Sequence, residues 1–306
     1  MDLHVIPYLC LGLAILACFW PRLPALLPAL LTIVACISAL LCDVISVAAI
    51  PSLAVIAALV GLHPLLRQRA PRAASIVLAL LALVLLALAM HKLPGFHNVL
   101  LLDQVQVSRD GIPFTLYANF DKGLAGVVLL LVLWPLSQYP QGNWQSQHRG
   151  PLAPPATSLR YDQLLWRGFW PLFPLTFLFS ELLGVTFGFL TWDPKFPSYT
   201  LLFLAVNLWL TCVAEELFFR GLLQTSLQRW LAARGYALWP AAVLVGLLFG
   251  VAHLAGGWPY AVAVTFAGIG YGLMYLRSGR IEVAILGHFA LNAVHFLLFS
   301  YPMLAS

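Results

Sequence analysis

The residues best suited to chemistry are three charged side chains in an apolar stretch: Glu215, Glu216 and Arg220. The fourteen-residue run before them, from Leu201 to Ala214, holds no charged residue. A charged side chain at the centre of a membrane costs roughly 2.5–3.5 kcal/mol on insertion scales. Three such charges within two helical turns therefore indicate a functional site.

The spacing within this segment separates the two glutamates. Glu216 and Arg220 are four residues apart with the glutamate first, which is the favoured order for a helical ion pair. Glu215 points about 100° away from Glu216 around a helix, so it needs another partner. We therefore expect Glu216 and Arg220 to form a structural or orienting pair and Glu215 to be the reactive carboxylate. A purely structural ion pair remains an alternative for Glu216 and Arg220.

Further polar side chains follow in the last apolar runs. His253 lies in one run, and His288, Asn292 and His295 share one helical face of another. At 1.5 Å per helical residue, these side chains and Glu215 reach similar depths near the middle of a membrane. Histidine packing and hydrogen bonding between helices are the alternative interpretations. For His295, which has no motif partner, packing is the preferred one.

A carboxylate, imidazoles and an amide suit hydrolysis by an activated water molecule. A glutamate shielded from bulk water can act as a general base, and a nearby histidine can orient the water. An imidazole N–H and an asparagine amide are donors suited to an oxyanion. No serine or cysteine nucleophile accompanies the histidines. Cys212 lies one turn before the glutamates, but its thiol is expected to stay protonated in apolar surroundings and is therefore a poor nucleophile.

Composition identifies the surroundings of this site. The chain has 306 residues, of which 62% are hydrophobic and 9% charged, and its mean hydropathy is +0.92. Soluble domains carry about 25% charged residues, so this is a polytopic membrane protein. The five cysteines show no Cys-x-x-Cys spacing, which argues against a disulfide framework or a zinc knuckle. The net charge of +5 comes from basic residues at the ends of apolar runs, which does not suggest a nucleic-acid partner.

The apolar runs predict an all-α bundle of about eight to ten transmembrane helices, with the active site inside it. A spanning helix needs about 20 apolar residues. We expect residues 92–122 and 139–163 to form loops and the glycines at 268, 270 and 272 to allow close helix packing. The predicted spans are 5–20, 24–42, 44–62, 75–91, 123–138, 168–190, 199–218, 238–256, 259–276 and 282–301.

Basic residues predict the orientation of these spans. Cytoplasmic loops of membrane proteins carry an excess of lysine and arginine. Counting spans places the arginine clusters on one side, which is then cytoplasmic, with both termini outside. We expect an integral, multi-pass protein of the plasma (inner) membrane. The clusters comprise Arg22; Arg67, Arg69 and Arg72; Arg149, Arg160 and Arg167; Arg229 and Arg234; and Arg277 and Arg280.

Three short patterns resemble the motifs of the CPBP intramembrane proteases. They are Glu215-Glu216-x-x-x-Arg220, Phe249-x-x-x-His253 and His288-x-x-x-Asn292. That family includes type II CAAX prenyl endopeptidases, bacteriocin-processing enzymes and Abi-type immunity proteins. The resemblance covers about residues 200–298, so we expect a protease core at 199–301 and variable transmembrane helices at 1–190.

The resemblance implies a role for each matching residue. Glu215 would be the water-activating base, aided by His253. The oxyanion would be stabilised by His288 and Asn292. The structural or orienting pair would be Glu216 and Arg220, in agreement with their spacing.

The predicted function is an intramembrane endopeptidase of the glutamic type. It would hydrolyse a peptide bond of a membrane-anchored protein or peptide, with membrane lipids around it and without a metal or other cofactor. One alternative is a zinc metalloprotease using Glu215, His253 and His288, although the chain has no His-Glu-x-x-His motif. Others are a proton-coupled transporter, since intramembrane ionisable groups also mark proton pathways, and a non-catalytic immunity protein.

Overall fold

A computed structural model describes residues 4–20, 23–24, 26–138, 163 and 165–305. The predicted loop at 139–163 therefore lies almost wholly outside the described residues, as do Arg22, Arg149 and Arg160. The chain divides into two compact units. The first comprises Met1–Leu101, Tyr117–Leu136 and Trp209–Ala214, and the second comprises Leu102–Leu116, Ser137–Leu208 and Glu215–Ser306. The predicted division at residues 190 and 199 concerns family membership and stays a prediction.

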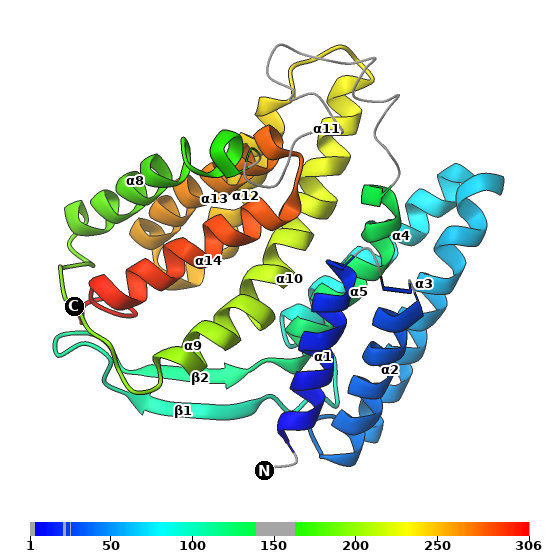
Figure 1. The fold of residues 1–306 in the computed structure, drawn as a ribbon, viewed down its shortest axis with the longest axis horizontal. Coiled ribbons are helices and arrows are strands. Elements are labelled where there is room, and N and C mark those ends of the chain that lie inside the picture. The colour runs from blue at the N-terminus through cyan, green and yellow to red at the C-terminus, as the bar shows by residue number, and fades with distance from the viewer. Residues whose placement is uncertain (1–3, 21–22, 25, 139–162, 164, 306) are drawn as a thin grey trace. The chain divides into compact units, whose positions relative to one another are not determined.

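The first unit consists mainly of helices. Helix α1 packs against α2, and α3 packs against α4 (Figure 1). Gly123, near the start of α5, lets that helix approach α1, because a Cβ atom there would lie 2.7 Å from the side chain of Leu11. The helices are α1 (Val5–Cys18), α2 (Leu26–Leu41), α3 (Ile50–Arg69, preceded by the 3-10 turn Val47–Ala49), α4 (Pro71–Ala89) and α5 (Phe120–Gln138).

In the second unit, α13 is the central helix. It contacts α12, α8 and α14 (Figure 1). A long helix over Thr200–Ala232 carries the two glutamates, and only its Trp209–Ala214 segment clusters with the first unit. The elements are the π-helical turn η2 (Leu165–Phe169), α8 (Phe173–Thr186), α12 (Trp239–Ala252), the 3-10 turn η5 (Leu254–Gly256), α13 (Trp258–Ser278) and α14 (Ile281–Leu298). The long helix comprises α9 (Thr200–Val206), η3 (Asn207–Cys212), α10 (Val213–Glu216), η4 (Leu217–Gln224) and α11 (Thr225–Ala232).

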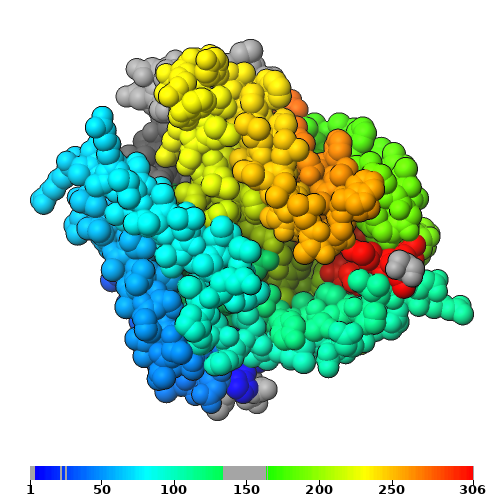
Figure 2. Space-filling model, turned by 180° about the vertical axis from the view of Figure 1, so that it is seen from behind, coloured from blue at the N-terminus to red at the C-terminus, as the bar shows by residue number. Residues whose placement is uncertain are grey.

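The predicted all-α membrane bundle is confirmed. Within the described ranges, six helices are long and apolar enough to cross a membrane, and α1, α2 and α12 are apolar but shorter. Large apolar side chains such as Leu244, Leu247 and Val251 are exposed on α12. Figure 2 shows α12 and α13 at the surface of the second unit, as expected for helices that face lipid. The chain is therefore a multi-pass integral membrane protein, and its number of spans stays a prediction.

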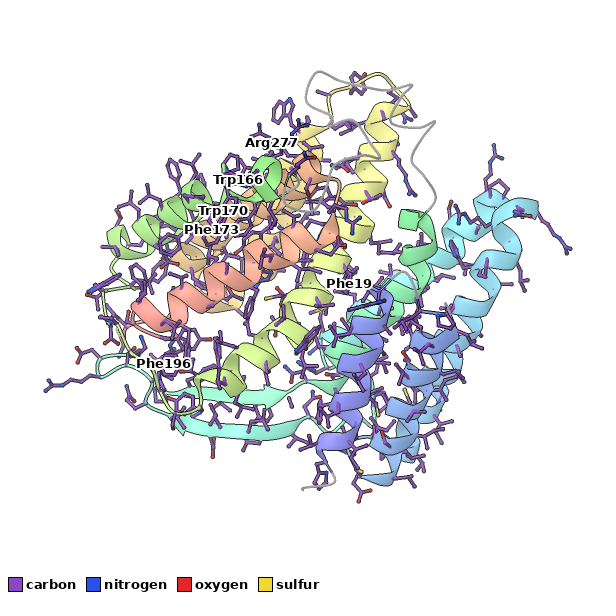
Figure 3. All side chains as sticks on the ribbon, in the orientation of Figure 1. Phe19, Trp166, Trp170, Phe173, Phe196 and Arg277 are labelled. Atoms are coloured by element: carbon purple, nitrogen blue, oxygen red, sulfur yellow. The ribbon has the colours of Figure 1, made fainter. Side chains whose placement is uncertain are left out.

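Trp166 and Phe196 mark opposite ends of the helices of the second unit. Figure 3 shows Trp166 and Arg277 at one end, and Phe196, in the loop before α9, at the other. Trp166 is exposed, as an aromatic residue at a membrane interface would be. The predicted orientation, in which the loop after Arg277 is cytoplasmic, stays a prediction.

The predicted loop at 92–122 was wrong in part, because it contains a β-hairpin. Strands β1 (Val99–Val105) and β2 (Phe114–Ala118) form a two-stranded sheet. The turn region is tied to the C-terminal segment by a bridge between Gly111 and Leu304. Aromatic and β-branched residues in β2 favour a strand, but the surrounding charges and turn residues masked this signal.

Close packing of α12 on α13 confirms the prediction for the glycine run. A Cβ atom on Gly272 would lie 3.2 Å from the Cα atom of Ala242. Gly246 and Gly250 on α12 are equally confined, since a Cβ atom on either would lie 2.7 Å from a backbone atom of α13. Small residues let helix backbones approach one another in membranes.

Helix α12 ends at Ala252, so it is four residues shorter at this end than the predicted span 238–256. Gly257 has φ +94°, a conformation that suits glycine, and Pro259 lies in the first turn of α13. These two residues stop one helix and start the next. His253 therefore caps the end of α12, whereas sequence analysis expected it inside a longer helix.

Candidate active site

The two glutamates lie between two π-helical segments of the long helix. Helix α10 holds Glu215 and Glu216 in its last turn, with η3 before it and η4 after it. π-Helical geometry is rare and frequently marks functional sites. The spacing between Glu216 and Arg220 nevertheless brings the two side chains together, as predicted.

Glu216 joins two helices through one oxygen atom. Arg220 Nη1 donates a hydrogen bond of 2.8 Å to Glu216 Oε1, and His288 Nδ1 on α14 lies 2.9 Å from the same oxygen. The side chains of Glu216 and Arg220 are 0% exposed. The predicted ion pair is present, and it also holds His288, a connection that sequence analysis did not make.

Arg220 is buried among carbonyl and aromatic groups of α12 and α13. Its Nη2 donates a hydrogen bond of 2.6 Å to the carbonyl of Gly268. The guanidinium carbon lies 4.7 Å from the ring centre of Phe249 and 5.4 Å from that of Tyr271. A buried ion pair is favourable only when such additional contacts offset the loss of hydration. Arg220 therefore anchors the long helix to its neighbours.

Glu215 faces the other side of the same imidazole. His288 Nε2 lies 3.9 Å from Glu215 Oε2, a distance too long for a direct hydrogen bond. The Glu215 side chain is 15% exposed, in contrast to the sealed Glu216. The ring of His288 stacks on Tyr271 with their centres 4.8 Å apart, which fixes its plane. One imidazole thus lies near both carboxylates, and Glu216 also accepts a hydrogen bond from Arg220.

His253 belongs to the same cluster through aromatic neighbours. Its Nδ1 lies 2.7 Å from the carbonyl oxygen of Phe249, which is one of the carbonyls left over at the end of a helix. The Phe249 ring centre lies 4.6 Å from that of His253 and 5.7 Å from that of His288. Phe249, the first residue of its motif, therefore contacts both imidazoles. Tyr260 on α13 packs against His253, with ring centres 6.2 Å apart, and interacts electrostatically with Glu215.

Asn292 pairs with a residue that sequence analysis missed. Its Nδ2 donates a hydrogen bond of 3.2 Å to Asn207 Oδ1, at the start of the π-helical segment η3. Asn207 is a polar residue in the uncharged run that ends at Ala214. A polar amide in an apolar run is a signal of an interhelical contact, but it is weaker than that of the charged residues that follow.

His295 has a partner that sequence analysis also missed. Its Nδ1 lies 3.1 Å from Glu181 Oε2 on α8, and both side chains are largely buried. Glu181 is the sole charged residue in the predicted span 168–190. A single carboxylate in an apolar span is costly at membrane depth, so the argument that selected Glu215 could also have selected Glu181.

The zinc alternative requires three ligands to converge. In the part of the chain that the structure describes, no three His, Cys, Asp or Glu side chains form a group that could hold a metal ion. This alternative uses Glu215, His253 and His288 as ligands. The Nδ1 atoms of His253 and His288 lie within hydrogen-bond distance of protein oxygens, so each of these atoms already has a protein partner.

A comparison with protein families adds independent information. Residues 197–294 match the family model described as type II CAAX prenyl endopeptidase Rce1-like. The match spans the long helix, α12, α13 and most of α14, which carry all three motifs. No curated protein and no solved structure gave a significant match to the chain.

Proposed function

We propose that this chain, whose residues 197–294 match the Rce1-like type II CAAX prenyl endopeptidase family, is a glutamate-dependent intramembrane endopeptidase. The observation that carries this proposal is the pair of carboxylates on either side of His288. The side chain of Glu216 is 0% exposed and pairs with Arg220, whereas that of Glu215 is 15% exposed. Such a pair provides a rigid support and a reactive base in one site.

In this proposal, Glu215 is the general base. Its carboxylate takes a proton from a water molecule, and the resulting hydroxide attacks the carbonyl of the substrate. The proton then passes to the leaving nitrogen as the C–N bond breaks. Glu216 is unsuited to this role, because one of its oxygens already binds Arg220 and His288 and because its side chain is 0% exposed.

His253 assists by holding the water molecule. When its Nδ1–H donates to the carbonyl of Phe249, Nε2 carries a lone pair that accepts a hydrogen from water. Its position next to Tyr260, which interacts with Glu215, supports this assignment. His253 therefore acts together with Glu215 on the same water molecule.

His288 and Asn292 stabilise the oxyanion. In this role, the ring of His288 carries a hydrogen on both nitrogens, donates one to Glu216 and directs the other toward the region of Glu215. The carboxylate of Glu216 stabilises the positive charge of that ring and fixes its orientation, as a buried aspartate does for the histidine of a catalytic triad. Asn207 fixes the amide of Asn292, so the donor is oriented before the substrate binds.

The proposed substrate is a membrane-associated protein or peptide. Glu215, His288 and Asn292 lie in helices long and apolar enough to cross a membrane, so a substrate must reach membrane depth. The name of the matched family points to prenylated C-terminal CAAX sequences, which are the first substrates to test. Membrane lipids are the surrounding partners, and the plasma (inner) membrane is the proposed location.

Purified protein in lipid vesicles, with a prenylated CAAX peptide as the probe, tests the proposal. Glu215→Gln keeps the size of the side chain but removes the base, so cleavage should fall about 10²- to 10⁴-fold. Glu282→Gln is the matched control, since Glu282 lies in the first turn of α14 and pairs with Arg280. Wild-type turnover by the Glu215→Gln protein would overturn the proposal.

The same preparation separates the alternatives. Loss of cleavage with a chelator and its recovery with zinc would favour the metalloprotease. Proton-coupled solute uptake without cleavage would favour a transporter. A folded protein that shows neither activity would favour a non-catalytic immunity protein.

A further inference from the structure

A second buried carboxylate–imidazole pair, Glu181 with His295, has no role in the proposed mechanism. It joins α8 to α14 through the 3.1 Å contact between Glu181 Oε2 and His295 Nδ1. The Glu181 side chain is 6% exposed and that of His295 is 15% exposed. An ionisable group is expensive at membrane depth and usually has a function there.

The pair continues the polar row of the active site. His288, Asn292 and His295 are at positions i, i+4 and i+7 of α14 and therefore share one face. Each contacts a polar side chain from a different segment of the unit. The three contacts are His288 with Glu216, Asn292 with Asn207, and His295 with Glu181.

The pair of Glu181 and His295 lies next to the candidate active site along α14. His295 is three residues, or less than one helical turn, from Asn292. Asn292 contacts Asn207, and His295 contacts Glu181.

The ring of His295 is held in a fixed orientation. It stacks on Phe299 with an interplanar angle of 8°, and its centre lies 5.6 Å from that of Tyr301. When Nδ1–H donates to an ionised Glu181, Nε2 carries the lone pair and can accept a hydrogen bond. Among the described residues, Nε2 has no partner, so the pair presents one oriented acceptor.

The spacing along α14 lies between one and two residues of an extended peptide. Asn292 and His295 are three residues apart, which is about 4.5 Å along a helix. An extended chain advances at most about 3.3–3.6 Å per residue. A substrate whose scissile carbonyl lies at Asn292 and that runs along α14 thus brings a neighbouring backbone N–H close to His295.

We propose that His295, oriented by Glu181, binds the substrate by accepting a hydrogen bond from a backbone N–H next to the scissile peptide group. The inference rests on the proposed function, because it takes Asn292 as the oxyanion donor. The ligand it defines is an extended peptide backbone. Glu181 is a positioning residue, since it acts through the ring of His295.

Substrate analogues with single backbone changes test this proposal. In a set of prenylated CAAX peptides, each amide N–H except that of the scissile bond is replaced in turn by an ester oxygen. The wild-type protein should show a KM raised roughly two- to tenfold at one position flanking the scissile bond, the effect of one lost hydrogen bond. The His295→Phe protein should show no added loss at that position, and Glu181→Gln should show a reduced one.

Controls separate binding from stability. Ser180→Ala alters the buried neighbour of Glu181 in the chain and should keep the wild-type pattern. If the pair is only structural, His295→Phe will lower the melting temperature and leave the ester pattern unchanged, which overturns the inference. The inactive Glu215→Gln protein allows the same comparison by peptide binding.

Failure of this inference is distinguishable from failure of the proposed function. An unchanged ester pattern together with an inactive Glu215→Gln protein contradicts only the role of His295. Full activity of the Glu215→Gln protein contradicts the mechanism itself. A peptide that wild-type protein neither binds nor cleaves counts against both.

Discussion

The two units of the chain treat buried charge differently. In the first unit, the buried carboxylate of Asp121 lies at the start of α5, and His91 Nδ1, on a half-exposed side chain, is 2.6 Å from it. In the second unit, Glu216 and Arg220 are fully buried within a long apolar helix, and His288 adds a third group. A charge at a helix end loses little hydration, whereas a charge at membrane depth needs partners that offset the loss of hydration.

This contrast indicates where function is located. The first unit builds its core from apolar side chains such as Leu11, Leu81 and Leu85 and keeps its charges near the ends of helices. The second unit places carboxylates, imidazoles and amides together inside its helices. The family match at residues 197–294 falls largely on the second unit.

The largest expected effect on stability comes from removing Arg220. Arg220→Leu leaves the buried carboxylate of Glu216 without its cation, which should lower the free energy of unfolding by about 3–5 kcal/mol. Denaturation in detergent micelles measures this change. Glu216→Gln combined with Arg220→Leu should be milder than Arg220→Leu alone, and equal losses would show that the ion pair does not act as a unit.

An intermediate effect on catalysis is expected from Asn207. Asn207→Ala removes the acceptor that fixes Asn292, so kcat should fall roughly two- to tenfold, as expected for one hydrogen bond. Because Asn207 orients a donor that acts in the transition state, KM should change little. Steady-state kinetics separate the two constants, and Thr211→Ala on the same π-helical segment is the control. A change in KM alone would show that Asn207 contacts the substrate.

The smallest effect on activity is expected in the first unit. Asp121→Asn weakens the contact with His91 and removes charge from the start of α5, so the melting temperature should fall. Turnover at a temperature where the variant stays folded should equal that of wild type. A loss of turnover without unfolding would contradict the functional contrast between the units.

Much of this architecture could be predicted from the sequence, because apolar runs identify helices directly. The ion pair between Glu216 and Arg220 followed from helical spacing alone. The end of α12 at Ala252 could not be placed, because hydropathy does not distinguish an α-helix from the 3-10 turn Leu254–Gly256 that follows it. The β-hairpin was missed because short strands outside the membrane leave only a weak signal among turn residues.

The partners within the site were harder to predict than its members. Asn207 and Glu181 reach their histidine or asparagine partners on α14 from distant parts of the chain. Helical spacing relates residues on one helix and contains no information about which helices are neighbours. The contact between His288 and Glu216, as opposed to Glu215, likewise depends on the rotation of α14.

The central claim is that the adjacent glutamates have separate roles, and a paired comparison of two variants tests it most directly. Turnover of a prenylated CAAX peptide and melting temperature are measured for Glu215→Gln and Glu216→Gln in the same vesicles. In the Glu215→Gln protein, kcat should fall about 10²- to 10⁴-fold at an unchanged melting temperature. In the Glu216→Gln protein, the main effect should be a lower melting temperature. Wild-type turnover by Glu215→Gln, or a fully stable and inactive Glu216→Gln protein, would contradict the account.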